Sequence, residues 1–81
     1  MSTRHLTALI TREREAYVAL CPELDIASQG GTIEEARANL QEALELFFET
    51  ASPEEIRSRL PGEMYITHLE VAVGSAAQGS V

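Results

Sequence analysis

Apolar and β-branched residues gather in two short runs near the start of the chain, from Leu6 to Thr11 and from Ala16 to Cys21. Runs of this length and composition are typical of β-strands. The charged residues Arg12 to Glu15 separate them, so the pattern predicts a β-hairpin. The connection lacks the Asn-Gly pair of the tightest hairpin turns, and the pattern therefore leaves the pairing register open.

A turn centred between Glu13 and Arg14 would sort the side chains of this hairpin onto two faces, because successive residues of a strand point to opposite sides. One face would carry Leu6, Ala8, Ile10, Tyr17, Ala19 and Cys21, and the other would carry Leu9, Val18 and Leu20. Both faces are then apolar.

The following residues indicate a third strand and a helix. Pro22 cannot donate a ladder hydrogen bond, so the second strand should end there and Asp25 to Gln29 can return as a third. Thr32 then has the residue type of a helix N-cap, and Glu35 completes a capping box. Apolar residues recur at helical spacing after it: Ile33, Ala36, Leu40, Ala43, Leu44 and Phe47. This pattern predicts an amphipathic helix.

A second helix and a last strand are expected beyond this point. Ser52 followed by Pro53 repeats the helix-start signal, and Pro61-Gly62 stops the helix after one short apolar stripe. Residues from Met64 to Val73 are rich in Ile, Val, Tyr and Thr, which favours a strand. We expect residues 1–74 to form one domain and residues 75–81 to be a flexible C-terminal tail.

The expected order is βββα(α)β, an α+β fold with a single-layer sheet. A chain that leaves a sheet through a helix and returns to it does so by a right-handed crossover, which places both helices on one face. The other face would stay open and expose an apolar patch that needs a partner. We therefore expect a homo-oligomer, a dimer or a tetramer.

Composition limits the possible functions. The chain has 81 residues, one cysteine (Cys21) and two histidines distant in sequence (His5 and His68), so an internal disulfide or a zinc site should not supplement the small core. No leader or membrane-spanning pattern is apparent, and we expect a cytoplasmic protein. The net charge of −7 disfavours nucleic acid and anionic membranes as partners and favours a basic protein.

The candidate chemistry indicates binding rather than catalysis. A two-metal nuclease needs several carboxylates that converge on the metal ions, but Asp25 is the only aspartate. We expect no enzyme activity, no catalytic residue, no metal and no cofactor. Glu23 and Asp25, two positions apart, are the candidate partner contacts, as acceptors for an arginine-rich surface. The alternative is that both are solvated charges at a strand corner.

Three segments resemble the HicB-like family in order and spacing: Tyr17 to Leu24, Gln29 to Ala36, and Asn39 to Leu44. They carry a tyrosine strand, a Pro-Glu-Leu corner, a glycine turn, a Thr-x-Glu-Glu-Ala helix start and an Asn-x-x-Glu-Ala continuation. Asp25-Ile26-Ala27 departs from the Pro-Gly-Cys of many members, and nothing resembling a DNA-binding module follows Val73.

The resemblance implies a partial ribonuclease-H-like sheet with the helix on one side. It also implies an antitoxin of a type II toxin–antitoxin pair, which blocks a small basic RNA-cleaving toxin of the HicA kind by steric occlusion. The alternative is an orphan self-associating domain, or a small-ligand binder, that has no toxin partner.

Overall fold

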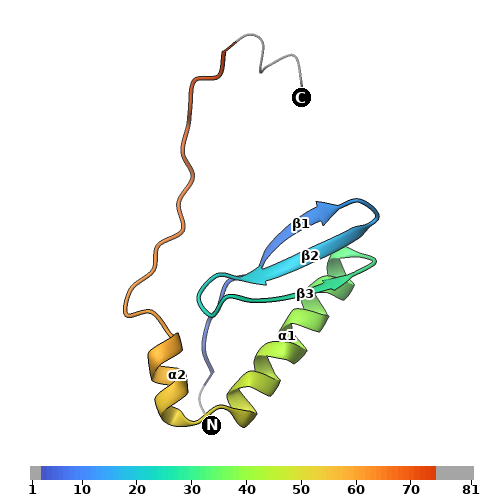
Figure 1. Cartoon of the computed structure of the whole chain (residues 1–81). Helices are drawn as coiled ribbons and strands as arrows, with labels where there is room; N and C mark the ends of the chain where they lie inside the picture. The colour runs from blue at the N-terminus through green and yellow to red at the C-terminus, as the bar shows by residue number, and fades with distance from the viewer. Residues whose placement is uncertain (1–2, 75–81) are drawn as a thin grey trace.

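Three strands and two helices follow one another along the chain (Figure 1): β1 (Leu9–Glu13), β2 (Ala16–Cys21), β3 (Ile26–Gly30), α1 (Ile33–Thr50) and α2 (Pro53–Arg59). The structure is a computed structural model that describes residues 3–74. Its elements confirm the predicted α+β class. The flexible tail predicted for residues 75–81 lies outside the described residues.

The strands form one antiparallel sheet in the order β1-β2-β3. Glu13 pairs with Ala16, so Arg14 and Glu15 make a two-residue turn, and Ile10 lies opposite Ala19 instead of Tyr17. Arg14 has φ 58° and Glu15 does not share this positive φ, as in a type II′ turn. This register, which the sequence pattern left open, differs by two residues from the one that a turn centred between Glu13 and Arg14 would give. A shift of two keeps every side chain on its expected face.

The helix α1 begins where the capping pattern placed it. The Thr32 hydroxyl accepts a hydrogen bond from the Glu35 backbone N–H at 3.0 Å, and the Glu35 carboxylate accepts one from the Gly31 N–H at 3.1 Å. The helix covers one face of the sheet, mainly over β3 and β2. It approaches β3 so closely that a Cβ atom on Gly30 would lie 2.5 Å from the Ala36 nitrogen.

The core lies between this face of the sheet and α1. Its buried residues, each at most 2% exposed, are Ala19, Cys21, Leu24, Ala36 and Leu40. Within residues 3–74, no helix covers the opposite face. It carries Leu9, Val18, Leu20 and Ala27, and Leu9 is 42% exposed. The sheet is therefore apolar on both sides, as the hairpin pattern predicted.

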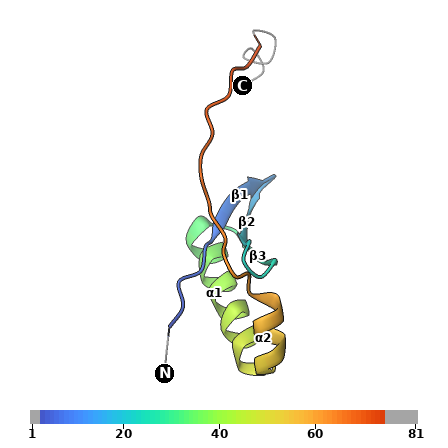
Figure 2. The same ribbon diagram turned by 90° about the vertical axis from the view of Figure 1, so that its left-hand side faces the viewer.

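The second helix lies beyond the corner between β2 and β3 in both views (Figures 1 and 2). Ser52 caps it by accepting a hydrogen bond from the Glu55 N–H at 3.1 Å. The Arg59 guanidinium donates to the Leu24 carbonyl and lies over the Phe47 ring at 5.1 Å. These contacts fix α2 against the corner, although none of residues 53–59 is buried.

The fourth strand expected at Met64–Val73 is not formed within residues 3–74. These residues run extended and carry the chain away from the sheet (Figures 1 and 2), and Tyr65 and Leu69 are 81% and 84% exposed. The crossover back to the sheet is therefore absent from the described chain. A strand-like sequence needs a neighbouring strand, and the described part of the chain places none beside it.

Candidate functional site

Glu23, one of the two predicted partner contacts, has a role inside the chain. Its carboxylate accepts hydrogen bonds from the Thr7 backbone N–H at 3.1 Å and from the Thr7 hydroxyl at 2.6 Å. Partial burial acts to raise the pKa of Glu23, but the hydrogen bonds from Thr7 outweigh it and hold that pKa below its ordinary value. Glu23 thus ties the segment before β1 to the β2–β3 corner.

The thiol of Cys21 lies beside this carboxylate and donates to it at 3.4 Å. Cys21 is fully buried, and burial, together with the neighbouring Glu23, raises the pKa of its thiol. A neutral buried thiol is unreactive. Cys21 is therefore a core residue.

Asp25 is exposed at the same corner, in the left-handed backbone region with φ 55°. Aspartate tolerates this conformation better than most residues because its short polar side chain can satisfy nearby backbone groups. Of the two corner carboxylates, Asp25 alone projects into solvent. A contact of either residue with a partner stays a prediction.

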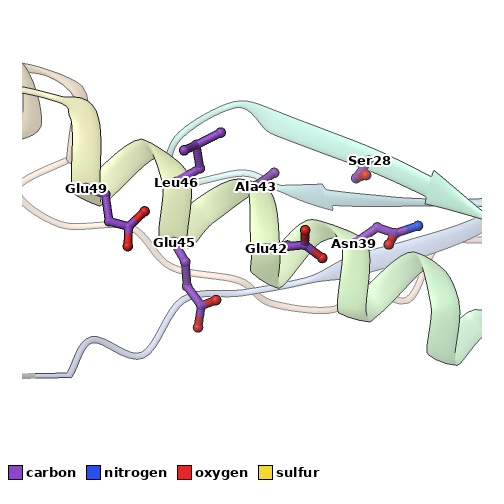
Figure 3. Close-up of a pocket in the computed structure, with 7 residues that line it drawn as sticks. All are labelled: Ser28, Asn39, Glu42, Ala43, Glu45, Leu46 and Glu49. Atoms are coloured by element: carbon purple, nitrogen blue, oxygen red, sulfur yellow. The ribbon is translucent and has the colours of Figure 1, made fainter.

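Several acidic side chains line an open groove of about 520 Å³ between β3 and α1 (Figure 3). We call it the β3–α1 groove. It is lined by Ser28, Asn39, Glu42, Ala43, Glu45, Leu46 and Glu49. The Asn39 amide donates to the Gln29 carbonyl at 2.8 Å and so holds α1 against the outer edge of β3. Leu46 is 58% exposed among the glutamates.

The charged side chains that line this groove are all acidic. Three carboxylates lie along α1, and within residues 3–74 no basic side chain forms an ion pair with Glu42 or Glu49. Arginine matches such a surface, because its guanidinium pairs with carboxylates while its carbon stem covers apolar atoms. The groove is therefore suited to a basic protein segment.

The sequence pattern predicts an amphipathic helix here but does not group these glutamates into a site. The available signal was Leu46, an apolar residue outside the predicted apolar stripe and between Glu45 and Glu49. An exposed apolar residue inside an acidic run indicates a binding surface better than the acidic run does, because exposed charges are ordinary on protein surfaces.

A second groove, of about 960 Å³, lies between residues 3–8 and α1. We call it the N-terminal groove. Its apolar lining consists of Leu6, Ala8, Leu40, Leu44 and Phe48. Except for the buried Leu40 and the exposed Ala8, these side chains are half-buried, so the groove is a partly open extension of the core on the β1 side of α1.

Residues 3–74 contain no group of three or more His, Cys, Asp or Glu side chains that could hold a metal ion. Neither of the two helices within that range has the length and apolarity needed to cross a bilayer.

Comparison with known proteins gives one informative relative. The chain is 47% identical over 60 residues to a UPF0150 protein of Synechocystis sp., and the match covers 72% of this chain and 82% of the relative. No family model matches the chain, and no solved structure matches it.

Proposed function

This chain belongs to the UPF0150 family, and we propose that it is a protein-binding module of the HicB-like antitoxin type. In this proposal it neutralises a small basic RNA-cleaving toxin of the HicA kind by covering the toxin's surface. The proposal combines the sequence resemblance of Tyr17 to Leu44 with the charge of the chain.

The β3–α1 groove carries the proposal. A protein that binds RNA presents arginine and lysine to the phosphates, and a groove lined by Glu42, Glu45 and Glu49 offers those side chains carboxylates instead. The exposed Leu46 supplies apolar contact at the centre. The net charge of −7 steers a basic partner towards this surface and raises the association rate.

Co-expression with a small basic protein encoded beside this chain tests the proposal. We expect the two proteins to co-purify and this chain to relieve growth inhibition by its neighbour. Absence of both results would refute an antitoxin role.

Charge reversal locates the contact. The double variant Glu42→Arg/Glu49→Arg should weaken toxin binding by about tenfold or more, in the range of close charged contacts at interfaces. The matched control is Glu13→Arg/Glu15→Arg at the exposed hairpin turn, which changes the net charge equally. If both variants bind alike, the groove is not the contact and only the overall charge matters.

A self-associating domain without a toxin is the second candidate. Its support is the apolar face of the sheet opposite α1 together with the exposed apolar residues after α2, including Tyr65 and Leu69. Light scattering on the purified chain checks it, because a monomer at micromolar concentration would contradict self-association.

A further inference from the structure

The segment Met64–Val71, which we call the tail strand, is extended and apolar. Large side chains are exposed on both of its sides: Tyr65, Leu69 and Val71 on one, Met64 and Ile66 on the other. An alternating extended segment places these two sets on opposite faces. Apolar residues on both faces indicate a strand that is covered from both sides in its functional state.

The N-terminal groove offers an apolar surface that matches the tail strand. The side chains of Leu44 and Phe48 extend the apolar face of α1 past β1, where the sheet ends. Because β1 is an edge strand, its outer backbone groups have no strand partner among the described residues. A strand added there would lie under the uncovered part of α1.

The other edge of the sheet is less suitable for an apolar strand. At β3 the Gln29 carbonyl already accepts a hydrogen bond from Asn39, and the adjoining groove is lined by glutamates. The N-terminal groove shares Glu45 and Glu49 with the β3–α1 groove, but its lining includes five apolar residues, against only Ala43 and Leu46 at the β3 edge. Apolar side chains such as Leu69 therefore gain more contact at the β1 edge.

We propose that the tail strand of a second copy of this chain pairs with the outer edge of β1 and seats its apolar side chains in the N-terminal groove. The exchange is reciprocal, so that each copy completes the sheet of the other. Such a two-fold, isologous arrangement is the commonest symmetry of homo-oligomers. The sheet of each copy then has four strands.

The path of the chain favours a second copy over a return to the same chain. Arg59 fixes the end of α2 at the β2–β3 corner through the Leu24 carbonyl. Only residues 61–63 link Leu60 to the tail strand, and they reach at most about 11 Å when extended. In both views the tail strand continues away from its own sheet (Figures 1 and 2), in position to reach another molecule.

Oligomeric state gives the first test, by light scattering on the full chain. We expect a dimer for the unsubstituted protein and a monomer for Leu69→Asp, with helix content unchanged because Leu69 is 84% exposed and lies outside both helices. Leu46→Asp, at an exposed leucine of the β3–α1 groove (58% exposed against 84% for Leu69), is the control and should remain a dimer. A monomeric unsubstituted protein, or a dimeric Leu69→Asp variant, overturns the proposal.

Disulfide cross-linking between two tagged chains tests the pairing itself. One chain carries Thr11→Cys in β1, and the other carries one cysteine in place of a residue from Ile66 to Glu70. Buried Cys21 stays as an unreactive background. We expect oxidation to give covalent dimers that contain both tags at one or more tail positions.

The remaining outcomes of this experiment each overturn the proposal. A chain that carries both new cysteines and closes the disulfide within itself, as a monomer, shows pairing to its own β1. Cross-links to Ala27→Cys in β3 in place of Thr11→Cys show that the other edge is used. Both tests measure association between copies of this chain and not toxin binding, so failure of toxin binding would leave this inference intact.

Discussion

The strand β2 and the tail strand have similar local sequences but very different structures. Both combine tyrosine, leucine and β-branched residues. In β2, Ala19 and Cys21 are fully buried, since the strand has neighbours on both edges and α1 above it. In the tail strand, Leu69 is the most exposed of the large apolar side chains. The difference shows that neighbours, rather than intrinsic propensity, decide whether such a sequence becomes a strand.

Truncation of a leucine should give the largest difference in stability between the core that buries β2 and the tail strand. Leu40→Ala removes a side chain that is 2% exposed and should lower the free energy of unfolding by about 2–5 kcal/mol. Leu69→Ala should leave the unfolding free energy of the dilute monomer unchanged within about 0.5 kcal/mol. Urea titration followed by circular dichroism measures both. Equal losses would show that the tail strand packs on its own body.

Replacing a glycine by alanine should give the next largest difference in stability between the packed sheet and the tail strand. A Cβ at Gly30 would lie 2.5 Å from the backbone nitrogen of Ala36, so Gly30→Ala must push α1 away from β3 at a cost of about 1–3 kcal/mol. Gly62, which leads into the tail strand, has nothing within 4 Å of such a Cβ. Gly62→Ala should therefore be neutral in the same urea titration, and a neutral Gly30→Ala would contradict the close approach of helix and strand.

The pH dependence of stability should distinguish Glu23 from Glu70 of the tail strand. The pKa of Glu23 is lowered in the folded chain, so its stabilising effect is present above the pKa of an unfolded glutamate, about pH 4.3. It is lost as the pH falls through the lower folded pKa. Glu23→Gln should remove about 1–2 kcal/mol near neutral pH, as expected for lost charge-assisted hydrogen bonds.

Thermal unfolding between acid and neutral pH measures this effect. The stability of the Glu23→Gln variant should change less with pH than that of the unsubstituted chain. Glu70→Gln is the control, since Glu70 lies in the exposed tail strand, and it should leave the profile unchanged. Identical profiles for both variants would show that the bond between Glu23 and Thr7 does not contribute.

The smallest expected effect concerns the hairpin turn. Arg14 is held at φ 58° by the pairing of β1 with β2, whereas the tail strand follows its local extended preference. Glycine adopts positive φ without steric cost, so Arg14→Gly should stabilise the body by up to about 1 kcal/mol. A small rise in melting temperature is the expected readout, and a fall would indicate that the Arg14 side chain contributes favourably.

Features that depend on residues close together in the sequence were predicted correctly more often than features that depend on distant segments. Both helix caps, Thr32 and Ser52, were predicted correctly because each depends on a bond to a backbone group three residues away. The hairpin register stayed open at the level of sequence, because nothing in the local sequence indicates that Arg14 adopts a positive φ. The β3–α1 groove could not be predicted, since it needs the outer edge of β3 and α1 to be side by side.

The sequence by itself determined where both helices begin, the face on which each residue of the hairpin lies, and the strong negative charge, because these depend on residue type and short spacing alone. Only the tertiary structure decided that Glu23 binds Thr7, that Leu46 lies in an acidic groove, and that the tail strand leaves its own sheet. These features are contacts, present or missing, between segments far apart in the chain. Local patterns cannot specify such contacts, since each requires the position of both segments.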